Sequence, residues 1–266
     1  MHRSLYSQSA FPVLQNRVYE SQESARTCPT GDIVIVEDLS TGLIYNAAFR
    51  TEVMAYDSYY NNELGQSQRF RMHLEKVANI IESYMGKEDL VEVGCGKGFF
   101  LEMLLKRGVD IRGFDPTYEG SNERITQSYF QPSIINHAKC LILRHVLEHI
   151  PNPVDFLFKV KEANGGGGLI YIEVPCFDWI CERCAWYDIF YEHVNYFRLC
   201  DFNRMFGKVL ASGKFFGNQY IYIVADLETL CEPKYDKVNS ACLPSDLSDK
   251  LVPCWSENTV SKNLEC

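Results

Sequence analysis

Short apolar runs alternate with segments of helical spacing through the middle of the chain. The runs, which are typical of buried strands, occupy residues 90–93, 109–114, 139–143, 169–174 and 219–225. The segments that we expect to be helical occupy residues 70–84, 99–105, 119–127, 153–162, 178–191 and 201–209. Strands that alternate with helices in this way predict an α/β fold with a doubly wound sheet.

The two ends of the chain have a different pattern. Residues 1–30 are polar and show little periodicity. The apolar runs 33–36 and 43–45 flank a short segment that ends in Gly42, and this arrangement predicts a β-hairpin with a glycine turn. From about residue 227 the chain is polar with scattered prolines and serines, which predicts a loosely ordered tail. We therefore predict an N-terminal extension, a core and a tail, over residues 1–55, 56–226 and 227–266.

Candidate chemistry follows the apolar run at residues 90–93. Gly94, Gly96 and Gly98 recur at every second position before helical spacing begins. Glycines let the backbone approach a ligand closely, and the free N–H groups of a helix N-terminus face that ligand. Asp115 closes the next apolar run about 20 residues on, where an acid accepts ribose hydroxyls. This unit predicts a site for a cofactor that contains an adenine nucleoside.

Two kinds of cofactor compete for this unit. In a dinucleotide fingerprint the third glycine would stand at Phe99, whose ring we expect to obstruct close packing of helix and strand. The pattern Glu92-x-Gly94-x-Gly96-x-Gly98 instead resembles motif I of the class I S-adenosylmethionine (SAM) methyltransferases. This resemblance favours SAM over a nicotinamide or flavin dinucleotide, and a glycine turn without a ligand is the third alternative.

Composition limits the partners that we expect. The 266 residues carry a formal net charge of −9 and have a pI of about 5.2, which argues against a broad surface for nucleic acid or an anionic membrane. No stretch approaches the roughly 18 consecutive apolar residues of a membrane span, and the first residues lack the apolar core of a secretion signal. We expect a cytoplasmic protein with a small-molecule substrate and neither a nucleic-acid nor a membrane partner.

The eleven cysteines are odd in number and irregularly spaced. Cys95 and Cys140 lie in apolar segments, which predicts buried free thiols in a reducing cytoplasm. Cys181-x-x-Cys184 is a single pair in a segment predicted to be helical. Without a second pair nearby, such a pair is more typical of core packing than of metal binding or redox chemistry.

Residues 11–226 resemble a bacterial family of SAM-dependent methyltransferases related to the sugar C-methyltransferases. Members of that family combine a small N-terminal zinc-binding module, a class I core and a distinctive C-terminal region. The most specific matching blocks are R-H-V-L-E-H-I-P at residues 144–151 and Y-E-H at residues 191–193. Further matches are P-V-L-Q-N at residues 12–16, G-L-I-Y-N-x-x-F at residues 42–49, Tyr56-Asp57 with Tyr60, Asn62 and Ser67, G-F-D-P at residues 113–116 and G-x-Q-Y at residues 217–220.

This resemblance implies a class I, Rossmann-like doubly wound sheet with a small N-terminal β-hairpin extension. It also implies SAM as cofactor and methyl transfer to a small polar acceptor, a nucleotide-linked ketosugar or related saccharide. The residues alone do not choose among C-, N- and O-methylation, whereas the resemblance favours carbon. The alternative is a non-catalytic SAM-binding or partner-binding protein that retained the methyltransferase core.

The resemblance also assigns residues to the site. In the catalytic group, His193 is the candidate general base, because a neutral imidazole can accept a proton near physiological pH. The other candidate catalytic residues are Glu192, His149 and Tyr191. The candidate cofactor-binding residues are Tyr60, Ser67, Glu92, Gly94, Cys95, Gly96, Gly98, Asp115, Pro116, Tyr129, Arg144 and His145. Glu192 and His193 are neighbours, so a direct pair between them would need irregular backbone.

Two departures from the family pattern change what we expect. The family's zinc module uses two Cys-x-x-Cys pairs, but Cys28 is the only cysteine before Cys95. One thiolate cannot build a four-ligand zinc site, so the module is degenerate and we predict no metal. The sugar C-methyltransferases also carry a tyrosine three positions before the histidine of their E-H pair, where this chain has Phe190.

The pattern His145-x-x-Glu148-His149 is also an inverted zinc-peptidase motif. That chemistry requires both histidines on one face of a continuous helix. Pro151 and Pro153 follow at once and would end a helix about one turn after His145. We therefore prefer a histidine–glutamate loop beside the cofactor, with either structural or substrate contacts.

Overall fold

The computed structural model describes residues 1–14, 17–54, 67–131, 137–243 and 247. By its internal contacts the chain forms two compact units. The larger unit contains Glu63–Pro175 and Leu199–Glu232, and the smaller unit contains Met1–Asn62, Cys176–Arg198 and Pro233–Cys266. Each unit combines segments that are far apart in the sequence. The three consecutive domains proposed above remain a prediction about boundaries.

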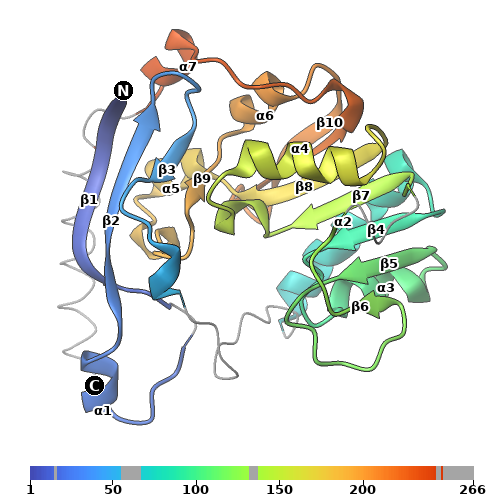
Figure 1. The fold of residues 1–266 in the computed structure, drawn as a ribbon, viewed down its shortest axis with the longest axis horizontal. Helices are drawn as coiled ribbons and strands as arrows, with labels where there is room; N and C mark the ends of the chain where they lie inside the picture. Colours follow the sequence, from blue (N-terminus) through green and yellow to red (C-terminus); the bar gives the residue numbers. More distant parts are fainter. Residues whose placement is uncertain (15–16, 55–66, 132–136, 244–246, 248–266) are drawn as a thin grey trace. The chain divides into compact units, whose positions relative to one another are not determined.

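A seven-stranded sheet forms the centre of the larger unit in the described part of the chain (Figure 1). Its strands are β4 (Leu90–Val93), β5 (Ile111–Phe114), β6 (Ile125–Thr126), β7 (Cys140–Arg144), β8 (Leu169–Pro175), β10 (Val209–Phe215) and β11 (Tyr220–Asp226). The strand order is β10-β11-β8-β7-β4-β5-β6. Strands β8, β7, β4, β5 and β6 are parallel, whereas β11 is antiparallel to both β8 and β10. The predicted doubly wound α/β sheet is confirmed.

The helices of the larger unit are α2 (Gln68–Met85), α3 (Phe99–Lys106), α4 (Pro153–Ala163) and α6 (Leu199–Met205). The Ser67 hydroxyl caps α2 by accepting from the Phe70 backbone N–H at 3.1 Å. At the other end of α2, Gly86 adopts a φ of 75° that ends the helix. Pro153 opens α4 in the first turn, where its missing N–H costs nothing.

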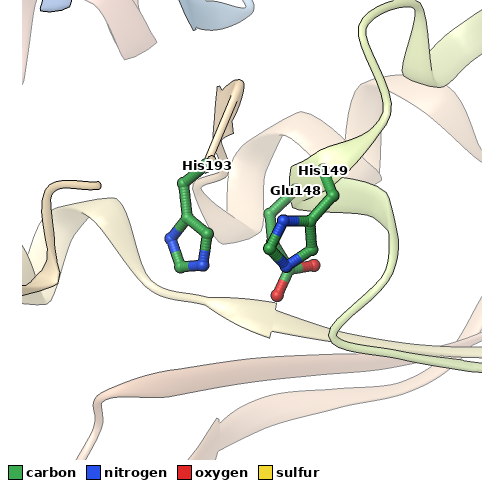
Figure 2. A group of neighbouring side chains, drawn as sticks. All are labelled: Glu148, His149 and His193. Carbon is green, nitrogen blue, oxygen red and sulfur yellow. The ribbon is translucent and has the colours of Figure 1, made fainter. Parts of the chain in front are cut away.

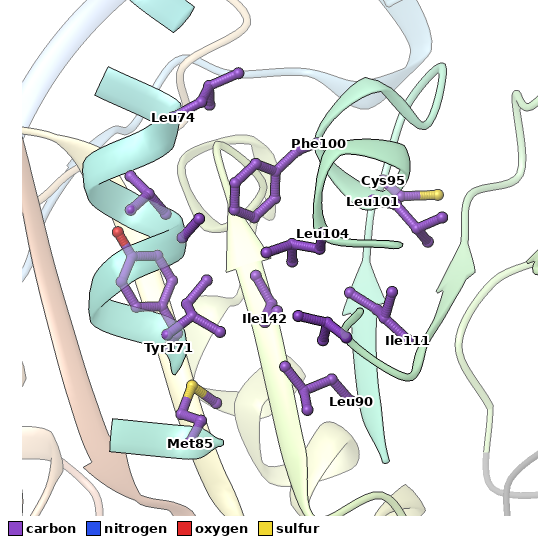
Figure 3. Packing of buried hydrophobic residues seen from close by; sticks show 14 of the residues in the cluster. Leu74, Met85, Leu90, Cys95, Phe100, Leu101, Leu104, Ile111, Ile142 and Tyr171 are labelled. Carbon is purple, nitrogen blue, oxygen red and sulfur yellow. The ribbon is translucent and has the colours of Figure 1, made fainter. Parts of the chain in front are cut away.

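One apolar core joins α2 and α3 to the same face of this sheet (Figure 3). Leu74 and Ile81 come from α2, Leu101 and Leu104 from α3, and Ile142 from β7, and all are almost completely buried. The connections β4–α3–β5 and β7–α4–β8 step in opposite directions along the sheet. Because such connections are right-handed, α3 and α4 lie on opposite faces.

One predicted helix of the larger unit is wrong, and the helix predicted over residues 201–209 is confirmed as α6 (Leu199–Met205) but ends four residues earlier than expected. Residues 119–127 form turns and then β6, because the Tyr118 hydroxyl accepts from the Asn122 N–H at 2.8 Å and the Asn122 side chain accepts from the Arg124 N–H at 3.0 Å. These local bonds offer the backbone an alternative to a helix. Residues 209–215 continue as β10 after α6, and their alternating exposure is that of an edge strand.

The smaller unit is built on a second sheet with the order β1-β2-β3-β9. Its strands are β1 (His2–Pro12), β2 (Thr30–Asp38), β3 (Ile44–Asn46) and β9 (Asn195–Tyr196), all paired antiparallel. The predicted hairpin is confirmed as β2 and β3. Strand β1 was not expected, because Tyr6 is the only buried residue in its polar sequence. An edge strand of this kind carries almost no apolar signal.

The helices of the smaller unit are α1 (Gln22–Arg26), α5 (Phe177–Arg183) and α7 (Lys237–Ala241), with a 3₁₀ turn, η1, at Thr51–Val53 and another, η3, at Trp186–Asp188. The helix predicted over residues 178–191 is too long. It ends at Arg183 because Cys184 adopts a left-handed φ of 49°.

Loose order is the wrong expectation for residues 227–243. A 3₁₀ turn, η4 (Leu227–Thr229), and α7 lie in this stretch. Within the smaller unit, the Ser240 hydroxyl donates to Glu37 at 2.9 Å and Arg198 donates to the Asn239 carbonyl at 2.8 Å. Leu243 is buried in the same core as Tyr191. None of the helices in the described part of the chain is long and apolar enough to cross a membrane.

Candidate cofactor site and catalytic residues

The strand order of the larger unit reverses between β4 and β7. From β4 the chain continues to β5 on one side, and from β7 it continues to β8 on the other. In open α/β sheets ligands bind outside the carboxyl ends of the strands at such a reversal. The carboxyl end of β4 leads into residues 94–98, and that of β7 leads into residues 145–149. Both segments singled out in the sequence therefore follow adjacent strands at this edge.

The three glycines of the turn serve different purposes. All have left-handed φ, at 72° for Gly94, 55° for Gly96 and 82° for Gly98, which favours glycine. A Cβ at Gly94 would collide with Val146, and one at Gly98 would collide with Ile125. Among the described residues, a Cβ at Gly96 would meet no atom within 4 Å. The backbone therefore borders open space at Gly96, and a ligand could approach it there.

Asp115 is tied to the glycine turn. Its Oδ2 accepts from the Gly96 N–H at 2.8 Å, and its Oδ1 accepts from the Thr117 N–H at 2.8 Å and the Thr117 hydroxyl at 2.7 Å. A carboxylate offers about four acceptor positions, so these bonds leave room for one more. Asp115 can accept from one ribose hydroxyl as it stands. Gripping both hydroxyls would require it to release a Gly96 or Thr117 bond.

Glu92 is a buried acid beside this turn. It is only 2 % exposed, and its Oε2 has no hydrogen-bond partner among the described residues. Burial is the main cause that raises the pKa of Glu92 to about 8; the Arg144 guanidinium opposes this shift, and the Asp115 charge adds to it. Glu92 is therefore mostly protonated at neutral pH and can donate as well as accept. An unsatisfied buried acid fits a site that awaits a polar ligand.

The reason given above against a dinucleotide is not the right one. Phe99 begins α3 and is 39 % exposed. Its ring therefore does not fill the space between α3 and the sheet. The choice of SAM over a nicotinamide or flavin dinucleotide therefore does not rest on Phe99.

Several other predicted cofactor residues can be placed. Cys95 is buried, and burial, reinforced by Glu92 and Asp115, raises the pKa of its thiol well above the usual range. Ser67 caps α2, while Pro116 is exposed and Tyr129 is 69 % exposed. Tyr60 lies outside the described residues, as do Tyr56 and Asn62. The cofactor roles of these residues remain predictions.

Arg144 and His145 make their contacts with buried acids. Arg144 Nε lies 3.7 Å from Glu173 Oε2, and its guanidinium stacks over the Phe100 ring at 4.3 Å. His145 Nδ1 lies 3.3 Å from Glu148 Oε1, and His145 Nε2 lies 3.2 Å from Glu173 Oε1. The structure therefore brings these two residues to Glu173, on β8, which was not singled out from the sequence. A charged residue inside the apolar run 169–174 is the signal that could have found it.

Glu148 and His149 project from a 3₁₀ turn, η2 (Leu147–His149), after β7 (Figure 2). Glu148 is 1 % exposed, and its Oε2 has no hydrogen-bond partner in the described part of the chain. His145, with a φ of 52°, is not helical. The two histidines of the H-x-x-E-H pattern therefore do not share a continuous helix, which argues against an inverted zinc-peptidase site.

The Y-E-H block lies in the smaller unit, just before β9. Tyr191 is completely buried, its hydroxyl accepts from the Arg50 N–H at 2.9 Å, and its ring packs against Phe49 and Gly31. These contacts account for Tyr191 as a packing residue. Glu192 is buried, and His193, also labelled in Figure 2, is half-buried.

The backbone around this block is irregular, with Tyr191 and Glu192 in a turn and His193 outside any helix, strand or turn. That irregularity is what a Glu192–His193 pair would need. The Phe190 ring lies 4.5 Å from the His193 ring. His193 thus packs against Phe190, at the position where the sugar C-methyltransferases carry a tyrosine.

The cysteine predictions can also be judged. Cys95 and Cys140 are buried free thiols, as expected, and burial raises the pKa of Cys140 to about 11. Cys181 lies in α5, and burial, with a smaller contribution from Asp178, raises its pKa to about 12. Such a thiol is unreactive at neutral pH, which agrees with a packing role for the Cys181-x-x-Cys184 pair.

Comparison with known proteins identifies the family. The family described as "Methyltransferase domain" matches residues 57–209, more than half of the chain. The PH0226 protein from Pyrococcus horikoshii OT3 matches with a TM-score of 0.50 and 16 % identity, over 68 % of this chain and 100 % of that chain. At that identity the likeness shows the fold. Among the curated proteins no sequence matches.

Two further solved structures are similar over a smaller part of the chain. Magnesium protoporphyrin IX methyltransferase (ChlM) from Synechocystis PCC 6803, solved with bound SAH, has a TM-score of 0.44 and 10 % identity over 59 % of this chain and 82 % of that chain. The plantazolicin methyltransferase BpumL in complex with SAH has a TM-score of 0.42 and 14 % identity over 59 % of this chain and 83 % of that chain.

The sheet order, the left-handed glycine turn and the acid at the end of β5 define a Rossmann-like methyltransferase of class I. The chain belongs to the methyltransferase-domain family. It is an enzyme whose methyl donor is SAM, and the predicted class of enzyme and cofactor are thereby confirmed.

Proposed function

We propose that this methyltransferase acts on a small polar acceptor, a nucleotide-linked ketosugar or a related saccharide, and transfers the methyl group to carbon. The observation that carries this proposal is the pair of blocks R-H-V-L-E-H-I-P and Y-E-H, which resembles the sugar C-methyltransferases. The first block follows β7 at the reversal of strand order, so Glu148 and His149 lie at the edge of the sheet where ligands bind.

The residues at the end of β4 fit SAM. When bound, SAM supplies a methyl group already activated on a sulfonium centre. Gly96 borders open space, Asp115 has one free acceptor position, and Glu92 is buried with an unsatisfied oxygen. These three groups would hold the nucleoside and its polar substituents. The remaining task of the protein is to align the acceptor with the methyl group.

Methylation of a carbon beside a ketone also needs a base and stabilisation of the enolate. We assign the base to His193, which is half-buried in irregular backbone and can accept a proton as neutral imidazole. We assign Glu192 and His149 to acceptor contacts. We leave Tyr191 out of the proposed chemistry, because its hydroxyl is buried and bonded to Arg50.

The acceptor can be tested by incubating the protein with SAM and a panel of nucleotide-linked ketosugars while S-adenosylhomocysteine formation is measured. We expect turnover that depends on a ketosugar, with the new methyl group on carbon by NMR. No turnover with any ketosugar, together with turnover when acceptors that are not saccharides are added to the same assay, would overturn the sugar assignment. SAM binding without turnover on any acceptor would favour the non-catalytic alternative.

The base can be tested with His193→Asn. We expect SAM affinity to stay close to wild type and kcat to fall by about 10²–10⁴, the scale for loss of a general base. The pH–rate limb in the range where imidazole titrates should also disappear. His2→Asn, an exposed histidine of the same unit, is the control. Wild-type turnover by His193→Asn would end the assignment.

A further inference from the structure

Glu173 is the centre of a buried charge cluster in the larger unit. It is completely buried on β8. Its Oε1 lies 2.7 Å from His73 Nε2 and 3.2 Å from His145 Nε2. Its Oε2 accepts from the Tyr171 hydroxyl at 2.7 Å and lies 3.7 Å from Arg144 Nε. Four side chains from three elements, α2, β7 with the residue after it, and β8, therefore converge on one carboxylate.

The His145 ring lies between two carboxylates. Its Nδ1 faces Glu148 at 3.3 Å and its Nε2 faces Glu173 at 3.2 Å. A neutral imidazole carries one N–H and one lone pair, so it would direct the lone pair at one of these acids. Only the protonated ring carries a hydrogen on both nitrogens. The contact to Glu173 is an ion pair and lacks hydrogen-bond alignment, which makes the ring's charge the main source of attraction.

The charges of the cluster support the same protonation state. Arg144 and a protonated His145 offset the carboxylates of Glu148 and Glu173, and His73 Nε2 also faces Glu173. The groups that face His145 are Glu148 from η2, Glu173 from β8 and the Tyr220 ring from β11 at 4.7 Å, with Arg144 preceding it and His73 of α2 beyond Glu173.

The backbone of His145 is held away from its preferred conformation. Its φ of 52° is unusual for a residue with a side chain, and such strain persists only where the surroundings enforce it. The His145 N–H donates to the Glu173 carbonyl at 2.9 Å. The next residue, Val146, occupies the space that a Cβ at Gly94 would need. The conformation of His145 thus determines what packs against the glycine turn.

We propose that His145 is protonated and that its contacts with Glu148 and Glu173 hold residues 144–149 against the glycine turn. We call this arrangement the imidazolium clamp. Glu173 is the positioning residue that keeps His145 protonated. The clamp shapes the cofactor site through Val146 and presents Glu148 and His149 at its edge. This inference rests on the proposed function only in that SAM binds beside Gly94 and Gly96. It is independent of the acceptor.

The first test uses the wild-type protein and histidine NMR. His145→Gln identifies the His145 resonance by its loss. The two acids should outweigh the opposing effect of burial and raise the pKa of His145 to about 9. Saturating S-adenosylhomocysteine should raise the midpoint further, because binding and protonation favour the same loop conformation. A midpoint near the ordinary value of about 6.5, or one that the ligand does not move, would overturn the proposal.

The second test uses Glu173→Gln, with Glu37→Gln as the matched control. Glu37 is equally buried, but it lies in the smaller unit, where it pairs with Arg3 at 3.0 Å and accepts from Ser240. Glu173→Gln should lower the His145 midpoint by at least about one unit and weaken SAM binding about tenfold or more at pH 8.5. Much of this affinity should return at pH 6, where His145 is protonated again.

Every result of these two tests either supports or contradicts the proposal. Glu37→Gln should leave both the midpoint and the affinity unchanged. An equal loss of affinity at both pH values would show a merely structural role for Glu173 and would overturn the proposal. If Glu173→Gln does not fold, the wild-type titration with and without ligand still decides. Failure of the wild type to bind either SAM or S-adenosylhomocysteine would instead count against the proposed function, while the midpoint of the free protein would still test the clamp.

Discussion

Glu92 and Glu173 are both buried glutamates on strands of one sheet, yet their surroundings shift their pKa values in opposite directions. Burial dominates at Glu92 and raises its pKa to about 8. At Glu173 the penalty of burial is outweighed by Arg144, His145 and His73, which hold its pKa well below the usual range. Glu92 Oε2 has no hydrogen-bond partner among the described residues, whereas both oxygens of Glu173 are engaged.

This contrast separates a binding region from a supporting one. The β4 end keeps open space at Gly96 and an unsatisfied acid, so part of its interaction capacity is left for a ligand. Glu173 instead makes its hydrogen bonds and ion pairs with other side chains of the protein. A change at the β4 end should therefore alter ligand binding more than folding, and a change at Glu173 should alter both.

The largest effect should come from filling the open space. Gly96→Val places a branched side chain where the ligand approaches, so SAM binding should be abolished in calorimetry while the protein stays folded. Gly108→Val is a matched control, because Gly108 also has a left-handed φ, 78°, and its Cβ would also meet nothing within 4 Å. Both variants place valine at a left-handed φ, so each carries backbone strain. Equal SAM affinity in the two would show that the open space at Gly96 is not the site.

The next effect should come from Asp115→Ala. The change removes the remaining acceptor position and also the bonds to Gly96 and Thr117 that shape the turn. We expect SAM affinity to fall by about 10- to 100-fold, or 1.4 to 2.8 kcal/mol, since a bond to a charged group contributes about 1.5–3 kcal/mol. Asp110→Ala, at an exposed ion pair with Arg124, should leave the affinity unchanged. Undiminished binding by Asp115→Ala would remove Asp115 from the site.

The binding region could be predicted from the sequence because its signals are local. Gly94, Gly96 and Gly98 stand in one turn, and Asp115 follows one strand later. The motif therefore carries both the conformation and the chemistry. The sheet was predictable for a similar reason, because fully buried parallel strands such as β4 and β7 are continuous apolar runs.

The supporting region could not be predicted, because its partners are distant in sequence. His73 and Glu173 are 100 positions apart and meet only through the fold. Strands β1 and β10 were missed for a different reason. Both are at sheet edges with few buried residues, so neither carries the apolar run by which strands were recognised. Tyr191 was assigned to the site by resemblance, and only the structure shows its buried contacts.

The pH dependence of stability, which concerns folding and not ligand binding, tests the contrast most directly. Glu92 has a pKa of about 8 in the folded protein and an ordinary value of 4.5. A raised acid pKa means that the folded state binds the proton more tightly, so wild-type stability should fall as the pH rises from 4.5 to 8. Glu92→Gln cannot titrate. The free energy of unfolding of this variant should therefore equal that of wild type near pH 4. At pH 9 it should be higher by a few kcal/mol, because each pKa unit corresponds to about 1.4 kcal/mol.

Glu173→Gln should have the opposite sign. The lowered pKa of Glu173 contributes stability above its ordinary value of 4.5, and that contribution is lost as the pH falls. The amide variant should therefore be less stable than wild type at pH 7 and approach it in acid. Urea unfolding of both variants from pH 4 to 9 measures the two signs. If both Glu92→Gln and Glu173→Gln stabilise the protein at high pH, burial, and not the partners around Glu173, determines the pKa of Glu173.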